Sequence, residues 1–157
     1  MDAQFLGDEK FQIPEALRLG HDEIRAELVR ASIDPGPIGD AAKRVARLCL
    51  PHFEQEEKAV FPVFGLLKDL ARGDVRPEMG AMLPLISRFS AWYDTLGNHH
   101  LSIDSAVGDL LDAAHEEDNR EIADFAYNLR VHERIEDEVI YPTVMLIGNY
   151  VREKLGM

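Results

Sequence analysis

Apolar residues recur along the chain at spacings of three and four residues, which is the period of an amphipathic α-helix. Strict alternation of apolar and polar residues between turn signals is not found, so the pattern predicts no β-strand. Three clusters of glycine, proline and polar residues interrupt the helical period, at residues 34–39, 73–77 and 115–119. The pattern therefore predicts four long helices, at about residues 14–32, 40–71, 78–115 and 119–154.

Short connections between long helices favour antiparallel neighbours, so the expected fold is all-α, an up-down-up-down four-helix bundle. We expect residues 1–13 to be an N-terminal extension and residues 14–157 to form one domain, long enough to bury its own core. Pro62 and Pro142 fall inside the second and fourth predicted helices, and each should kink its helix because proline lacks a backbone donor. Asp118 and Glu121 have the spacing of a capping box at the start of the fourth helix.

An internal repeat surrounds these two prolines. The second predicted helix contains His52-Phe-Glu-Gln-Glu56 and then Phe61-Pro62, and the fourth contains His132-Glu-Arg-Ile-Glu136 and then Tyr141-Pro142. A further histidine precedes each motif at nearly the same distance, because His21 and His52 are 31 residues apart and His100 and His132 are 32 apart. The chain thus contains two similar helix pairs, each with one histidine followed by His-x-x-x-Glu.

The spacing of each motif places its histidine and glutamate together on one face of a helix. Apolar neighbours at helical spacing, such as Val45 beside His52 and Val139 beside His132, indicate that these faces point into the bundle. Buried imidazoles and carboxylates without partners would cost several kcal/mol for each charged group. A bound pair of metal ions removes this cost, because imidazole and carboxylate are both good ligands of transition metals.

A single histidine on an apolar face is more often a packed core residue than a metal ligand, and a single His-x-x-x-Glu is often a pair on a helix surface. Six such residues at matching positions of the two repeats are harder to explain as packed core residues or surface pairs. The sequence therefore predicts a two-metal site whose candidate ligands are His21, His52, Glu56, His100, His132 and Glu136. Two histidines per metal and two shared glutamates leave coordination positions open for a small molecule.

The same residues resemble those of the hemerythrin-like proteins with the HHE cation-binding domain. The resemblance extends from about residue 14 to residue 150 and rests on the two motifs, their aromatic-proline sequences and the two preceding histidines. It implies a four-helix bundle with a non-haem di-iron centre, Fe²⁺ or Fe³⁺, bridged by two carboxylates and an oxo or hydroxo group. By this resemblance the four histidines are terminal ligands, and Glu56 and Glu136 are the bridges. Zinc or nickel could replace iron in a recombinant sample.

The sequence departs from the oxygen-carrying hemerythrins in its third predicted helix. Those proteins have His-x-x-x-His there, whereas Leu96 and Asp104 stand four residues on either side of His100. They also use His-x-x-x-x-Asp on the fourth helix, a spacing at which Asp137 stands from His132. In a regular helix Asp137 points about 140° away from His132, so a π-bulge would be needed to bring it in. The missing histidine favours redox chemistry, sensing or iron handling over reversible oxygen carriage.

Several neighbouring residues leave alternatives open. His99 could be the ligand instead of His100 if the third helix is rotated, and Asp137 could replace Glu136 as a bridge. Tyr93 lies two turns before His100 and could line the pocket. Cys49 is better explained as a small core residue than as a redox group. Glu57 and Asp137 could accept hydrogen bonds from the ligand imidazoles.

Composition narrows the function classes further. The chain carries 17 Lys and Arg against 29 Asp and Glu, a formal net charge of -12, which disfavours nucleic acid and anionic membrane surfaces as partners. One cysteine and an N-terminus without a basic and apolar leader pattern lead us to expect a cytoplasmic protein. No Glu-x-x-His motif of the ferritin-like carboxylate proteins occurs.

The expected function is that of a di-iron protein that binds or senses dioxygen, nitric oxide or peroxide, or that handles iron. The alternative is a di-iron redox enzyme of the oxidase or peroxidase kind, using the open coordination positions. The sequence leaves the oligomeric state open.

Overall fold

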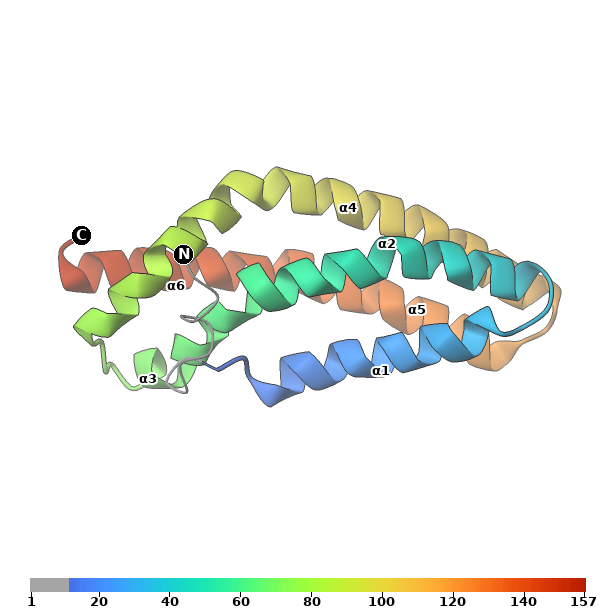
Figure 1. The fold of residues 1–157 in the computed structure, drawn as a ribbon, viewed down its shortest axis with the longest axis horizontal. Coiled ribbons are helices and arrows are strands. Elements are labelled where there is room, and N and C mark those ends of the chain that lie inside the picture. Colours follow the sequence, from blue (N-terminus) through green and yellow to red (C-terminus); the bar gives the residue numbers. More distant parts are fainter. Residues whose placement is uncertain (1–11) are drawn as a thin grey trace.

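The computed structural model describes residues 12–157, and this part of the chain is helical throughout, without a β-strand. The helical segments form four rods, each a single helix or a run of consecutive helical segments. The first rod is α1 (Glu15–Ser32), and the second comprises α2 (Pro37–Ala59), a 3₁₀ segment (Phe61–Leu66) and α3 (Leu67–Ala71). The third rod is a 3₁₀ segment (Pro77–Met82) followed by α4 (Leu83–Glu116). The fourth is α5 (Arg120–Ile135), a π-helical turn (Glu136–Ile140) and α6 (Tyr141–Leu155). Figure 1 shows these four rods side by side, an arrangement compatible with a four-helix bundle.

The connections fall at the three predicted breaks. Gly36, with φ 119°, precedes α2, and Gly73, with φ 80°, lies between α3 and the next 3₁₀ segment. Positive φ is favourable for glycine because it has no Cβ. The connections before α2 and before α5 lie at the same end of the molecule (Figure 1). The predicted extension, residues 1–13, lies almost wholly outside the described residues.

The predicted capping box is wrong in detail. Asn119, rather than Asp118, is the residue that precedes α5, and its side-chain oxygen accepts a hydrogen bond from the backbone N–H of Ile122 at 3.1 Å. Asp118 adopts a positive φ of 53° in the turn before it. Asparagine and aspartate serve equally well as N-caps, so the spacing alone did not distinguish the two positions.

Both interior prolines interrupt their rods, as predicted. Pro62 lies in the 3₁₀ segment that follows α2, and Pro142 lies at the start of α6, directly after the π-helical turn. The π turn changes which side chains face inward. Val139, expected on the interior face beside His132, is 55% exposed, while Tyr141 is 1% exposed.

The bundle core consists of two apolar clusters at opposite ends of the rods. One extends from Val60 through α4 to Val151, and the other contains Leu28, Val45 and Phe125 with their neighbours. At the first end Gly148 of α6 lies so close to Ile86 of α4 that a Cβ there would be 2.6 Å from its Cγ2 atom. The polar residues predicted as ligands lie between these two clusters along every rod. None of the helices described combines the length and apolar character needed to span a bilayer.

Candidate metal centre

The structure brings all six predicted ligands together in one buried layer between the two apolar clusters. They come from all four rods: His21 from α1, His52 and Glu56 from α2, His100 from α4, His132 from α5, and Glu136 from the π turn. Five of them are at most 4% exposed, and the His132 side chain is 24% exposed. Helical spacing alone therefore identified side chains that meet in space.

The layer contains two overlapping groups whose ligand atoms lie within 4.8 Å of one another. The first group is His52, His100, Glu133 and Glu136, and the second is His21, His132 and Glu136. Each group could hold a metal ion. Glu136 belongs to both groups, so its carboxylate lies within reach of a cation held in either group.

Glu56 lies between the two groups. Its Oε1 atom is 3.1 Å from Nε2 of His52 and 3.8 Å from Nε2 of His21. Its Oε2 atom accepts a hydrogen bond of 3.0 Å from the hydroxyl of Tyr141. Glu56 therefore faces a histidine of each group, which is the placement required of a second shared carboxylate.

Glu133 is a member of the cluster that the sequence analysis did not identify. It is 4% exposed, and its Oε2 atom is 2.8 Å from Nε2 of His100. The repeat contains a signal that could have found it. Glu133 occupies the repeat position of Phe53, which is fully buried, so the repeat predicts a buried carboxylate at residue 133.

Glu57 and Asp137, which directly follow Glu56 and Glu136, each contact the Nδ1 atom of a candidate ligand imidazole. Glu57 Oε1 is 3.3 Å from Nδ1 of His21, and Asp137 Oδ1 is 2.8 Å from Nδ1 of His100. Arg25 holds Glu57 in turn by two hydrogen bonds of 2.7 Å. Such contacts fix the orientation and tautomer of an imidazole, so that its Nε2 lone pair faces the cluster. The structure thus places Asp137 behind His100 and leaves Glu136 inside the cluster.

The two halves of the repeat differ in their other neighbours. Around His21 the repeat supplies aromatic rings, because Phe53 stacks on it at 4.0 Å and Phe61 lies at 4.8 Å between ring centroids. Around His100 the equivalent positions are Glu133 and Tyr141, whose ring stacks on the imidazole at 5.4 Å. One half of the cluster is therefore apolar, and the other has an additional carboxylate and a hydroxyl.

Tyr141, rather than Tyr93, is the tyrosine of the site. Its hydroxyl is 3.1 Å from Nε2 of His100 as well as 3.0 Å from Glu56. Burial, and then the charges of Glu56 and Glu136, raise the pKa of this hydroxyl, so it stays a hydrogen-bond donor at neutral pH. Tyr93 is 36% exposed, and its ring lies 6.1 Å from that of Tyr141. The spacing from His100 placed Tyr93 on the correct side of α4 but could not show which ring reaches the cluster.

Seven buried nitrogen and oxygen atoms of the cluster have no hydrogen-bond partner within the described part of the chain. They are His21 Nε2, His132 Nε2, Glu56 Oε1 and both carboxylate oxygens of Glu133 and Glu136. Two of these atoms nevertheless lie close to an imidazole nitrogen: Glu133 Oε2 is 2.8 Å from His100 Nε2, and Glu56 Oε1 is 3.1 Å from His52 Nε2. A buried polar atom without any partner costs roughly 1–3 kcal/mol, and more where it is charged. Native interiors rarely leave so many polar atoms unsatisfied in one place. These imidazole nitrogens and carboxylate oxygens are suitable ligands for bound metal cations.

The pKa values of the cluster residues in the metal-free protein also reflect buried groups that lack suitable partners. Burial lowers the pKa of His21 to about 4 and also lowers that of His132, so both imidazoles are neutral and have free lone pairs. Burial would lower the pKa of His100 too, but the carboxylates of Glu133 and Asp137 outweigh it and raise the pKa to about 9. Burial and the charge of Glu56 raise the pKa of Glu136 well above its usual range. The metal-free cluster therefore retains protons that bound cations would replace.

His99 and Cys49 lie outside the cluster. The Nδ1 atom of His99 is 3.4 Å from Nδ1 of His52, so it contacts the outer side of a candidate ligand. Of the two adjacent histidines on α4, the structure places His100 in the ligand layer. Cys49 is fully buried in the apolar cluster that contains Phe53, and this burial raises the pKa of its thiol. Its surroundings agree with a packing role.

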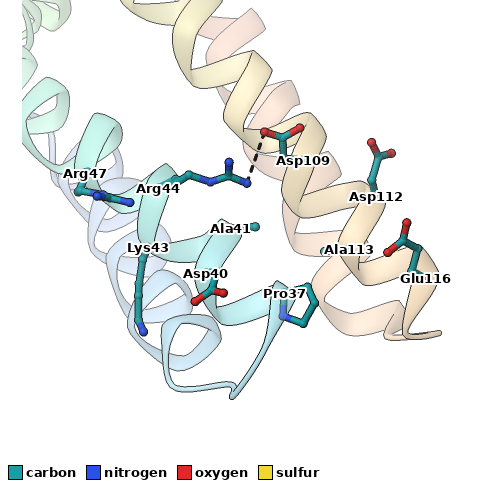
Figure 2. A pocket seen from close by; sticks show the side chains of 10 residues that line it. All are labelled: Pro37, Asp40, Ala41, Lys43, Arg44, Arg47, Asp109, Asp112, Ala113 and Glu116. Carbon is teal, nitrogen blue, oxygen red and sulfur yellow. Dashed lines mark ion pairs between the residues drawn. The ribbon is translucent and has the colours of Figure 1, made fainter.

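A surface pocket of about 640 Å³ is separate from this cluster. Figure 2 shows it between the start of α2 and the end of α4, with three basic side chains and Asp40 on α2 and acidic side chains on α4. Arg44 and Asp109 face each other across it at 3.5 Å. Both side chains are more than half exposed, so this is a solvated ion pair of little energetic weight. None of the candidate ligands lines this pocket.

The Glu133→Gln substitution is expected to weaken metal binding in one group only. Glu133 belongs to the group of His52 and His100 but not to the group of His21 and His132. We expect the affinity of one metal to fall by about 100-fold, more than the loss of an outer contact causes, and that of the other to change little. Titration of the metal-free protein with cobalt, followed by absorption, measures both affinities. Equal weakening of both would contradict the grouping.

Comparisons of the chain with protein-family models, curated proteins and solved structures found no significant match. The class of this protein is therefore assigned from its fold and its site. It is a helical protein, compatible with a four-helix bundle, whose buried histidine and glutamate side chains could hold metal ions.

Proposed function

We propose that this chain is a hemerythrin-like, two-metal protein that holds a pair of iron ions and binds a small ligand such as dioxygen, nitric oxide or peroxide. The observation that carries the proposal is the set of seven buried ligand atoms without hydrogen-bond partners among the described residues. Four imidazoles and three carboxylates suit a pair of transition-metal ions, and three negative charges offset most of the four positive charges of two divalent ions.

The ligand set also supports an open centre. The group of His21 and His132 has two imidazoles and Glu136, with Glu56 Oε1 3.8 Å from His21 Nε2, which leaves coordination positions for an exogenous molecule. When bound, the metal pair would supply the affinity for that molecule and any redox chemistry. The protein contributes oriented imidazoles, through Glu57 and Asp137, and the surrounding apolar clusters exclude bulk water.

A second candidate function is a redox enzyme with the same metal pair. The observation that favours it is the buried hydroxyl of Tyr141, which lies 3.0 Å from Glu56 and 3.1 Å from His100. This hydroxyl can donate a hydrogen bond or a proton to a bound oxygen-containing ligand. Turnover of peroxide by the iron-loaded protein, and its loss in Tyr141→Phe with metal content retained, would favour the enzyme over the binder.

Metal analysis and absorption spectroscopy test the proposed function. Protein purified without oxygen and reconstituted with ferrous iron should hold about two irons per chain and develop ligand-to-metal charge-transfer bands in air. Azide should shift these bands if a coordination position is open. Protein that remains free of bound metal under these conditions, and that is unaffected by His52→Ala and His132→Ala, would overturn the proposal.

Metal binding is expected to release protons and to weaken as the pH falls. His100, with a pKa of about 9, is protonated at pH 7 in the metal-free protein and must lose that proton to coordinate, and the raised pKa of Glu136 favours its protonated form as well. Below pH 9 the affinity should therefore fall about tenfold per pH unit for each proton displaced. Calorimetry in buffers of different ionisation enthalpy measures the release. Binding without proton release at pH 7 would show that these groups do not coordinate.

A further inference from the structure

Two surface pockets reach the ligand cluster, one on each side of α5. The first, about 490 Å³, lies between α4 and α5, and its buried lining residues are His100 and Glu133. The second, about 410 Å³, lies between α1 and α5 and reaches His132. The first pocket therefore contacts two members of the cluster and the second contacts one.

The α4–α5 pocket reaches a buried carboxylate of the cluster. Glu133 is 4% exposed, and its Oε1 atom has no hydrogen-bond partner within residues 12–157. Its Oε2 atom lies 2.8 Å from Nε2 of His100, and both atoms belong to the group that could hold a metal ion. The pocket thus leads from solvent to one metal position.

The two pockets differ in charge. The α4–α5 pocket is lined by two arginines, Arg130 and Arg134, and by three carboxylates, those of Asp104, Glu133 and Asp137. Arg130 pairs with Asp104 at 2.6 Å, and Arg134 pairs with Glu138 at 3.0 Å. The lining of the α1–α5 pocket has four carboxylates and neither lysine nor arginine; the four are Glu23, Glu27, Glu121 and Asp124. Within about a Debye length, carboxylates repel an approaching anion, whereas guanidinium groups attract it. The α4–α5 pocket is the more favourable approach for a small anion.

The side chains behind the two pockets also differ in polarity. Behind His132 lies the ring of Phe53, with 5.8 Å between centroids, which offers no polar contact. Next to His100 lies the hydroxyl of Tyr141, 3.1 Å from Nε2. A small anion entering beside His100 therefore meets a polar hydroxyl, whose proton is donated to Glu56 in the metal-free protein, and one entering beside His132 meets an apolar ring.

From this geometry we infer that the α4–α5 pocket is the entry route and outer binding site for a small anionic ligand of the metal pair. The inference rests on the proposed function, because the ligand's destination is the metal position of His52, His100 and Glu133. It goes further by assigning the route to one face of the bundle and the ligand to a chemical class.

Two glycines allow a matched test, because each opens one of the pockets. Gly97 of α4 lines the α4–α5 pocket and Gly20 of α1 lines the α1–α5 pocket. A Cβ at either position meets no atom within 4 Å, so a leucine fits each helix and extends into its pocket. Neither residue belongs to the ligand set.

Azide, added to the oxidised, iron-loaded protein in a stopped-flow instrument, is the probe. In Gly97→Leu we expect association and dissociation rates to fall together by roughly tenfold or more, because a blocked route slows both directions equally. The equilibrium affinity and the metal content should stay at the wild-type values. In Gly20→Leu both rates should remain those of the wild type.

Wild-type azide rates in Gly97→Leu, or an equal slowing in Gly20→Leu, would overturn the inference while leaving the proposed function intact. Metal-loaded wild type that binds no azide would also overturn it. A wild-type chain that takes up no metal would instead refute the proposed function, before any azide is added.

If Gly97→Leu fails to fold or to load, Gly97→Cys provides the same test. It can be loaded first and then labelled with a bulky thiol reagent, because the natural Cys49 is fully buried. Azide rates are compared before and after labelling. Slowing on labelling supports the route, and unchanged rates overturn it.

Discussion

The Glu136→Gln substitution is expected to abolish binding of both metals, the largest effect of any single change in the site. Glu136 is the one residue common to both groups of candidate ligands, and both of its carboxylate oxygens are buried without hydrogen-bond partners in the described chain. Glutamine keeps the shape of the side chain but lacks the charge and the second oxygen needed to bridge two cations. We expect each affinity to fall by at least about 100-fold, more than an outer contact contributes.

The fold should survive this substitution. Glu136 is a buried carboxylate 1% exposed, with a raised pKa, and its neighbour in the cluster is another carboxylate, Glu56. The raised pKa favours the neutral, protonated form of Glu136 in the metal-free protein, so a neutral glutamine adds no buried charge. The metal-free variant is therefore expected to unfold at the wild-type temperature or above it. Circular dichroism checks the fold, and equilibrium dialysis against cobalt or ferrous iron measures the metal content.

Glu138→Gln is the matched control. It makes the same chemical change two residues away in the same π turn, but Glu138 is 63% exposed and pairs only with Arg134 at the surface. Its metal content should equal that of the wild type. Retention of both metals by Glu136→Gln, or an equal loss in Glu138→Gln, would contradict the shared role of Glu136.

Metal is expected to raise the unfolding temperature substantially. The metal-free cluster buries seven unsatisfied polar atoms, and cations that bind only the folded state stabilise it by mass action. A metal at about 1,000 times its dissociation constant contributes about 4 kcal/mol. For a chain of this size, each kcal/mol raises the midpoint by roughly 2–4 °C, so one metal should shift it by on the order of 10 °C.

Differential scanning calorimetry with ferrous iron or cobalt, and then with excess chelator, measures this shift. Magnesium is the control ion, because it prefers oxygen ligands and should stabilise little in a histidine-rich site. His52→Ala should lose the part of the shift that comes from the first group, since His52 is a candidate ligand of that group only. The same midpoint with metal and with chelator would show that the cluster is not a metal site.

The sequence alone predicts much of this architecture because the repeat is regular where it carries the ligands. Both His-x-x-x-Glu motifs lie in helices, and an i, i+4 spacing places two side chains together whatever the tertiary structure does. The helical breaks were predictable for the same reason, since Pro62 and the glycines at residues 36 and 73 act through local backbone geometry. Such features depend on neighbours in sequence.

The parts that were not predicted depend on the π turn and on departures from the repeat. The turn at residues 136–140 shifts the helical register, so Val139 faces solvent and Tyr141 reaches the cluster. Periodicity at 3.6 residues per turn cannot anticipate such a shift. Glu133 was missed because it stands where the other half of the repeat has Phe53, and a carboxylate next to His132 is otherwise typical of a helix surface.

The most direct test of a two-metal centre is anomalous X-ray diffraction from crystals of the iron- or cobalt-loaded protein. The proposed two-metal centre predicts two anomalous peaks about 3.5–4 Å apart, the usual separation of two-metal sites. One peak should lie among His52, His100, Glu133 and Glu136, and the other among His21, His132 and Glu136. A single peak, or peaks only at surface carboxylates, would contradict the account.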